Sequence, residues 1–214
     1  MLCANETHAS RRPAILVTGF GPFPGVETNP TSTLVPALTD DARLRHPDFE
    51  FASAILPTQW DAAPRHVVQL IQSLQPCLVL HFGAARQAQG FRIERRAKNW
   101  CRSTVDAAGR LPTTNRVRHT GPDIHDATLP HDAILERLAQ HGLPAALSDD
   151  AGGFLCNAVL YHSLAEAASQ PRPFVSGFIH IPADLSGPPL TFAEALRGGR
   201  YILQTLIEAL DQSR

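Results

Sequence analysis

Short apolar runs that alternate with longer segments of helical spacing are the feature that most constrains the fold of this sequence. Residues 14–18 (AILVT) are apolar on both faces and stop at Gly19, as expected of a strand buried on both sides. Further strands are predicted at residues 51–56, 77–82, 144–148 and 174–181, and helices at 62–74, 131–141 and 154–169, with two more beginning near Asn29 and Thr191. This alternation predicts an α/β fold, a single three-layer α/β/α domain around a mostly parallel twisted sheet.

Local signals support several of these boundaries. Asn29-Pro30 is a good pair for a helix start, and Gly142 is a typical residue for a helix end. Thr191 and Glu194 have the spacing of a capping box. We therefore expect one catalytic domain over residues 13–214, preceded by a flexible extension at residues 1–12.

The segment from 101 to 128 bears Pro, Thr and Gly with little periodicity. A connection this long is uncommon in a compact domain unless it has a role, so we expect it to cover a site.

Charge and hydropathy exclude several classes of partner. The formal net charge is −1, which gives no reason to expect nucleic acid or an anionic membrane surface. No apolar run approaches the roughly 20 residues of a membrane span, and the N-terminus lacks the charged-then-apolar order of a signal peptide.

The cysteines and histidines argue against a disulfide framework or a metal site. The cysteines are widely spaced with no CxxC, and the ten histidines form no HExxH or HxH pattern. We expect no metal site and a reducing cytoplasm, in which a thiol stays reduced. The cysteines are Cys3, Cys77, Cys101 and Cys156.

Cys156 and His180 are the candidate catalytic pair. Cys156 closes a glycine-containing loop at the start of a predicted helix, whose amides would favour a thiolate and could hold an oxyanion. His180 lies at the end of a predicted strand and could exchange a proton with the thiol. The alternative is that Cys156 is a small buried hydrophobic residue.

A third residue should orient the imidazole, and Glu94 is the preferred candidate. It follows the third predicted strand, in a segment rich in arginine. Asp149, Asp150 and Asp184 are rivals, although turn formation and capping are the favoured explanation for them. In a parallel sheet the loops after Thr18, after Phe82, after Ser148 and after His180 should meet at one edge, where ligands bind.

A phosphate-binding role for the glycines at 19–25 is disfavoured. The GxGxxG spacing fails, and Pro22 and Pro24 remove amide donors that a phosphate would need.

Four motifs, in order, resemble the pyroglutamyl peptidase I family. They are TGFGPF at residues 18–23 followed by Asn29-Pro30, ERRAKN at 94–99, the Ser-x-x-Ala-Gly-x-x-x-Cys-Asn pattern at 148–157, and FIHIP at 178–182. Together they span roughly residues 14–182 with spacing close to that of the family.

The resemblance implies a Cys156–His180–Glu94 triad that removes an N-terminal pyroglutamyl residue from small peptide substrates without a cofactor. It also implies that Phe20 and Phe23 enclose the flat lactam ring, and that Asn29 lies near it, although packing of the loop and capping of a helix are alternative roles. A homo-oligomer is a further implication.

Two departures from the family bear on the substrate. The family's Gly-Gln-Ala-Gly-Gly-Arg becomes Gly-Ala-Ala-Arg-Gln-Ala at residues 83–88, and a family arginine near the reacting carbonyl has Arg102 as its candidate replacement. Two alternatives therefore stay open: a thiol amidohydrolase for a different N-terminal acyl group, and a non-catalytic binding paralogue.

Overall fold

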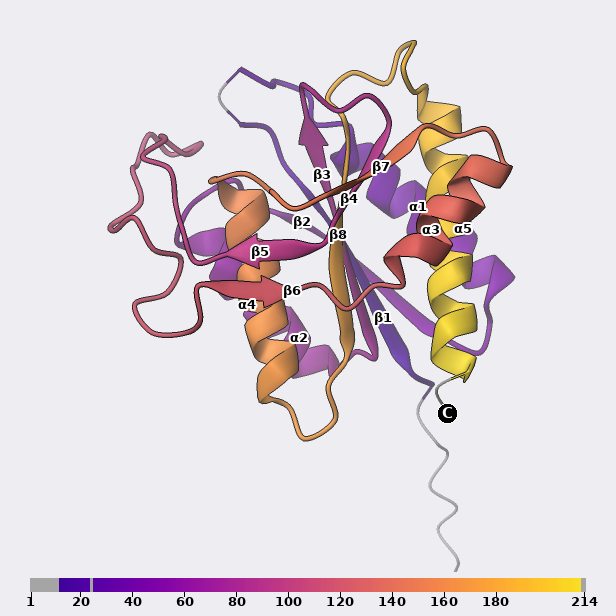
Figure 1. The fold of residues 1–214 in the computed structure, drawn as a ribbon, viewed down its shortest axis with the longest axis horizontal. Helices are drawn as coiled ribbons and strands as arrows, with labels where there is room; N and C mark the ends of the chain where they lie inside the picture. Colours follow the sequence, from indigo (N-terminus) through magenta and orange to yellow (C-terminus); the bar gives the residue numbers. More distant parts are fainter. Residues whose placement is uncertain (1–11, 24, 213–214) are drawn as a thin grey trace, which may run out of the picture.

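A six-stranded sheet forms the centre of the computed structural model, which describes residues 12–23 and 25–212 (Figure 1). Its strand order is β2-β1-β3-β8-β4-β7. The strands are β1 Ala14–Phe20, β2 Glu50–Leu56, β3 Leu78–Ala85, β4 Phe91–Glu94, β7 Ala145–Ser148 and β8 Val175–Pro182. The extension predicted at residues 1–12 lies, apart from Arg12, outside the described residues.

Helices cover both faces of this sheet, which confirms the predicted three layers (Figure 1). Three of them, α1 Thr31–Arg45, α3 His131–Gln140 and α5 Phe192–Gln212, pack on one face. The other two, α2 Ala62–Leu74 and α4 Leu155–Ser169, pack on the opposite face.

The sheet is mostly parallel, as predicted, but its two strands at one edge run the other way. β2, β1, β3 and β8 are mutually parallel, whereas β4 is antiparallel to β8 and β7 is parallel to β4. The loop after Ser148 still lines one cavity with the residues after Phe82, as predicted, but the expected reason, a strand parallel to β3 and β8, is wrong. Sequence analysis missed β4, because this strand is only four residues long and carries Arg92 and Glu94.

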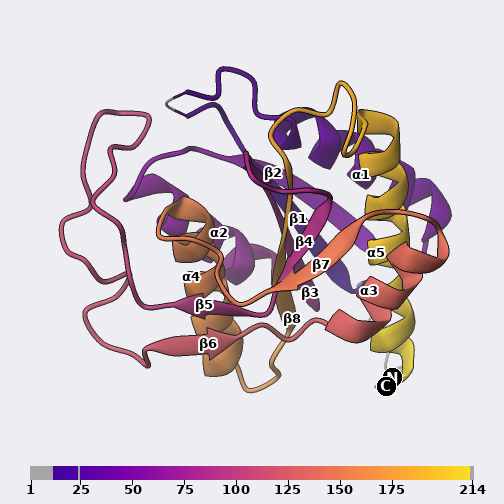
Figure 2. The ribbon, with the colours of Figure 1, turned by 45° about the horizontal axis from the view of Figure 1, so that its top comes forward.

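A separate two-stranded ribbon lies against α4 (Figure 2). It consists of β5 Arg96–Lys98 and β6 Ile124–Asp126, paired antiparallel with Ala97 opposite His125. The connection between them is fastened by Asp106, whose carboxylate accepts the backbone N–H of Trp60 at 3.0 Å. The segment expected to be irregular over 101–128 thus ends in a short strand.

Alternate residues of the central strands face the two helical layers. Ile15 and Val17 belong to the core beneath α1 and α5, and Leu16 to the core beneath α2 and α4. Helix α4 is apolar on nearly all sides because it lies between the sheet, α2 and the β5–β6 ribbon.

The predicted ends of two helices are confirmed. Gly142 has φ +67° just after α3, where the N–H of Leu143 donates to the carbonyl of Leu138 at 3.0 Å. At the start of α5, Thr191 and Glu194 exchange the two hydrogen bonds of a capping box. Among the described residues, no helix combines the length and the apolar character needed to cross a membrane.

Candidate active site

Cys156 is the second residue of α4 and lines the same cavity as His180. A β-carbon placed on Gly83 would lie 3.1 Å from the sulfur of Cys156, so the thiol sits directly over β3 at this point. Gly83 in turn pairs with His180 across β3 and β8. The absence of a side chain at Gly83 therefore lets the thiol approach β3 at the residue that pairs with His180 of β8.

Antiparallel pairing of β4 with β8 brings Glu94 to His180. Glu94 lies opposite Phe178, so it is the diagonal neighbour of His180 on the same face of the sheet. The Nδ1 atom of His180 is 2.7 Å from Oε1 of Glu94. The position of Glu94 within a strand, rather than in the loop after β3 as predicted, produces this contact.

The Glu94 carboxylate is fully buried and remains charged. Its side chain has 0% exposure, and Oε1 also accepts a hydrogen bond from Nε of Arg92 at 2.8 Å. Burial acts to raise its pKa, but the hydrogen bond to His180, the charges of His180 and Arg92 and a contact with Ser148 outweigh it and lower the pKa.

His180 is neutral at neutral pH. Burial lowers the pKa of its imidazole, and the hydrogen bond and charge of Glu94 offset this only in part. With the proton on Nδ1 shared with a carboxylate, Nε2 is left as an acceptor. The imidazole is thus in the form that a general base requires.

The thiol of Cys156 is also neutral at rest. Burial raises its pKa to about 12, with the negative charge of Glu94 as the next cause, while Arg92 acts weakly in the other direction. The expectation that the helix start favours a resting thiolate is wrong, because desolvation outweighs the helix amides. A thiolate forms here only if His180 takes the proton.

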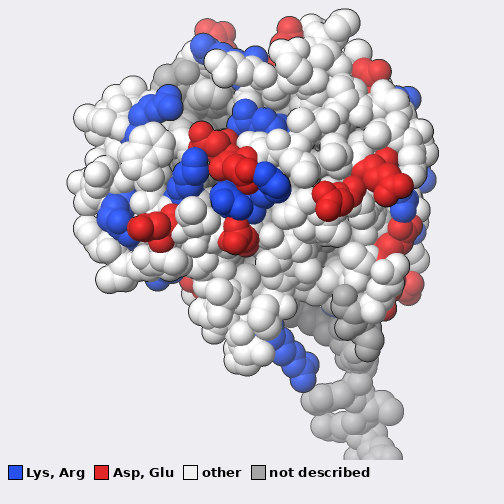
Figure 3. All heavy atoms as spheres, in the orientation of Figure 1, with Lys and Arg blue, Asp and Glu red and all other residues white. Residues whose placement is uncertain are grey.

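The three aspartates that rivalled Glu94 have other partners. Asp149 pairs with Arg95 and Arg96, and Asp150 pairs with Lys98 at 3.3 Å. These pairs form part of the mixed patch of positive and negative side chains over β4, β5 and β7 in Figure 3.

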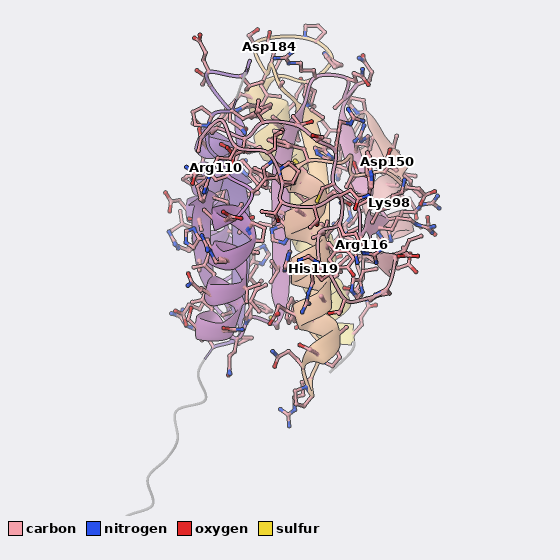
Figure 4. All side chains as sticks on the ribbon, turned by 90° about the vertical axis from the view of Figure 1, so that its left-hand side faces the viewer. Lys98, Arg110, Arg116, His119, Asp150 and Asp184 are labelled. Carbon is pink, nitrogen blue, oxygen red and sulfur yellow. The ribbon has the colours of Figure 1, made fainter. Side chains whose placement is uncertain are left out.

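Figure 4 shows Asp150 beside Lys98 at one edge, with Asp184 apart from them at the end of the molecule beyond β8. Asp184 accepts the N–H of Ser186 at 2.9 Å, as expected of a turn residue.

A cavity of about 350 Å³ opens over Cys156 and His180. Its size is at the lower end of the range for small-molecule sites. Phe20, Phe23 and Asn29 all lie on its wall, where the sequence predicted them. The further lining residues are Thr58, Ala84, Ala85, Arg86, Gln87, Arg92, Arg102, Ala151, Gly152, Phe154 and Leu155.

Three phenylalanines make one part of this wall aromatic. Phe20 packs on Phe178 beneath the site, with ring centroids 6.1 Å apart. Phe23 lies 6.3 Å from the ring of Phe154, which in turn meets Trp60 edge to face at 5.1 Å. Phe154 was missed by sequence analysis, although its place two residues before Cys156 was a usable signal.

Asn29 holds the loop before α1 in place. Its Nδ2 donates to the carbonyl of Gly21 at 3.1 Å, and its Oδ1 accepts from the N–H of Thr31 at 3.1 Å. The side chain therefore caps the start of the helix and fixes the loop that carries Phe23, so its structural role is established by these contacts.

Arg102 and the altered segment at residues 84–88 also border the cavity. The N–H of Arg102 donates to the carbonyl of Gly153 at 2.7 Å, which places this arginine beside the loop that leads to Cys156. Ala84 through Gln87 continue β3 into the same wall. Among the described residues, no group of three or more His, Cys, Asp or Glu could hold a metal ion.

Comparison with known proteins gives one consistent family. The model of the pyroglutamyl peptidase family matches residues 13–187. The pyrrolidone-carboxylate peptidase of Oceanobacillus iheyensis is 35% identical over 79% of this chain and 83% of its own length. Pyrrolidone-carboxylate peptidase 1 of Ralstonia nicotianae is 33% identical over 94% of this chain and 96% of its own.

Solved structures agree with this relationship. A pyrrolidone carboxyl peptidase from Thermococcus litoralis superposes with a TM-score of 0.86 at 25% identity, covering 94% of this chain and 96% of that one. A mutant pyrrolidone carboxyl peptidase from Pyrococcus furiosus gives a TM-score of 0.84 at 28% identity, covering 92% and 99%.

Proposed function

Since the chain belongs to the pyroglutamyl peptidase family, we propose that Cys156, His180 and Glu94 form a catalytic triad that hydrolyses the amide bond after an N-terminal pyroglutamyl residue. The observation that carries the proposal is the 2.7 Å contact between His180 and the buried Glu94, beside a thiol that borders the same cavity. A protein that only binds its ligand would not require a thiol, an imidazole and a carboxylate in this arrangement.

The reaction starts from a neutral thiol and a neutral imidazole. Nε2 of His180 takes the proton of Cys156 as the sulfur attacks the pyroglutamyl carbonyl, and Glu94 stabilises the resulting imidazolium. We assign the oxyanion to backbone amides at the start of α4, where the first turn of the helix has unpaired N–H groups. His180 then gives its proton to the leaving amine, which departs as the shortened peptide and leaves a thioester on Cys156.

Water completes the cycle. His180 accepts a proton from a water molecule as its oxygen attacks the thioester. Pyroglutamate then departs, and His180 returns the proton to the sulfur, which restores the neutral thiol and imidazole. An uncharged lactam suits the aromatic part of the cavity, and we assign its enclosure to Phe20 and Phe23. Asn29 acts on the ring indirectly, through the loop that its hydrogen bonds hold.

The altered segment at residues 84–88 favours a second candidate, the same chemistry on a different N-terminal acyl group. Ala84 stands in the cavity wall where the family has glutamine, and Arg86 and Gln87 stand there where the family has glycines. Parallel kinetics on pyroglutamyl, prolyl and acetyl amides of one chromogenic amine separate the two candidates. A non-catalytic binding paralogue would hydrolyse none of them.

The decisive experiment is release of a chromogenic amine from a pyroglutamyl amide. We expect turnover that iodoacetamide abolishes and that Cys156→Ala lacks, while Cys77→Ala, which removes a thiol outside the cavity, keeps it. Absence of hydrolysis at high concentration of folded enzyme would refute the pyroglutamyl assignment.

We further propose that residues 13–214 act as one catalytic domain in a reducing cytoplasm and assemble as a homo-oligomer. Within the part of the chain that the structure describes, the cysteines are not joined in disulfides, which supports a reducing compartment. Assembly rests on the family resemblance, and sedimentation at micromolar concentration tests it.

A further inference from the structure

Arginines border the catalytic cavity on its solvent side. Arg86 and Arg102 are exposed residues of its wall, whereas Arg92 is partly buried beside Glu94. None of the described residues that line the cavity is an aspartate or a glutamate. Glu94, the carboxylate of the proposed triad, is buried and does not line the cavity. The mouth of the cavity is therefore positively charged.

The three guanidinium groups differ in how far they are already engaged. Arg92 donates to Glu94 and to the carbonyl of Asp150. Arg86 donates to the carbonyl of Gly25. Arg102, within the part of the chain that the structure describes, forms no ion pair and no side-chain hydrogen bond.

The backbone of Arg102 is nevertheless fixed. Its N–H donates to the carbonyl of Gly153 at 2.7 Å, and its guanidinium lies 6.0 Å from the ring centroid of Trp100. A guanidinium that rests on an aromatic ring, on a fixed backbone and without a hydrogen bond or ion pair, is suited to recognise an anion, because little ordering remains when the anion arrives.

The orientation of a bound peptide would bring Arg102 close to the part of the substrate that follows the scissile amide. If the acyl ring occupies the aromatic part of the cavity, the rest of a peptide must leave through the mouth, since 350 Å³ cannot enclose a longer chain. We propose that Arg102, assisted by Arg86, binds a carboxylate just beyond the scissile amide. The enzyme then prefers pyroglutamyl peptides whose second residue is acidic, or dipeptides whose free C-terminus lies at that position. This inference rests on the proposed function.

Two matched pairs of substrates test it and separate the two sources of the carboxylate. Pyroglutamyl-Glu-amide against pyroglutamyl-Gln-amide reports an acidic side chain. Pyroglutamyl-Ala against pyroglutamyl-Ala-amide reports a free C-terminus. We expect kcat/KM about tenfold higher for the carboxylate member of at least one pair, about the effect of one charge-assisted hydrogen bond. Raising the salt concentration to 0.5 M should reduce this ratio, because exposed charges are screened.

Variants then assign the preference to the residue. Arg102→Gln should lower the ratio to about twofold or less, Arg102→Lys should keep part of it, and Arg172→Gln, which changes an exposed arginine outside the cavity, should keep all of it. The ratio is measured within each variant, so a general loss of activity does not imitate the result.

Two results would overturn the inference while the proposed function stands. One is a ratio near one in both pairs for an enzyme that hydrolyses pyroglutamyl amides. The other is a preference that survives both Arg102→Gln and Arg86→Gln. Absence of hydrolysis of every pyroglutamyl substrate would instead refute the proposed function, and this inference with it.

Discussion

Replacing Glu94 by glutamine tests the central feature of the site. The glutamine has the shape of the buried carboxylate but no charge, and its amide can donate a hydrogen bond where the carboxylate only accepts. If the amide donates to Nδ1 of His180, the imidazole proton moves to Nε2. The ring could then no longer accept the proton of Cys156, although every heavy atom stays in place.

The size of the effect follows from the contacts of Glu94. The variant loses a 2.7 Å charge-assisted hydrogen bond, the correct tautomer and the charge that stabilises the imidazolium. In triads such changes lower kcat by about 10²- to 10⁴-fold, or about 2.7–5.5 kcal/mol of transition-state stabilisation. KM should stay within about twofold, because Glu94 does not line the cavity.

A pyroglutamyl chromogenic amide measures both constants, with Glu136→Gln on the exposed surface of α3 as the matched control. Because Arg92 loses its charged partner in Glu94→Gln, circular dichroism is needed to check that the variant is folded. The pH profile adds a second readout. Glu94 raises the pKa of His180, so its neutralisation should lower that pKa and move the acid limb of kcat/KM to lower pH.

A folded Glu94→Gln variant with kcat within threefold of the parent would refute the orienting role. An unchanged acid limb would show that Glu94 does not set the protonation of His180. A large loss confined to KM would instead indicate that Glu94 contacts the substrate.

Three further substitutions test other features of the structure. Gly83→Ala should lower kcat/KM at least about tenfold and cost about 1–3 kcal/mol of stability, since its β-carbon would lie 2.6 Å from the ring of Phe178; equal activity and equal unfolding in urea would contradict this. Burial lowers the pKa of His81 from 6.5 to about 3. Between pH 6.5 and pH 3 the imidazole binds a proton in the unfolded chain but not in the folded one, so the free energy of unfolding falls as the pH decreases below 6.5. Urea unfolding should show a loss of about 2 kcal/mol from this group between pH 7 and pH 5, absent in His81→Gln. Asp106→Ala should cost about 1–3 kcal/mol and raise KM, because it frees the N–H of Trp60 and the connection after β5; an unchanged melting temperature would argue against this anchor.

The strand and helix pattern was predictable wherever an element is long and buried. The runs at 14–18 and 174–181 are almost entirely buried and mostly apolar, and the capping box at Thr191 is a local signal. β4 could not be found in this way, because Arg92 and Glu94 make half of it charged, and only pairing with β8 makes it a strand.

The sequence by itself predicted which residues belong to the candidate site. Four ordered motifs contain Cys156, His180, Glu94 and the phenylalanines. The chemistry of a thiol, a base and its partner requires these particular side chains, and substitution would abolish that chemistry. It could not determine how they meet, since that depends on pairing between strands far apart in the chain.

The tertiary structure decided the direction of β4, which makes Glu94 the diagonal neighbour of His180, and the closeness of the thiol to Gly83. It also decided the protonation of the resting site. A helix start beside Cys156 suggested a thiolate, but desolvation depends on everything packed around the sulfur, and here it raises the pKa to about 12. Local sequence carries the identity of reactive groups, whereas burial and strand pairing set their charge and geometry.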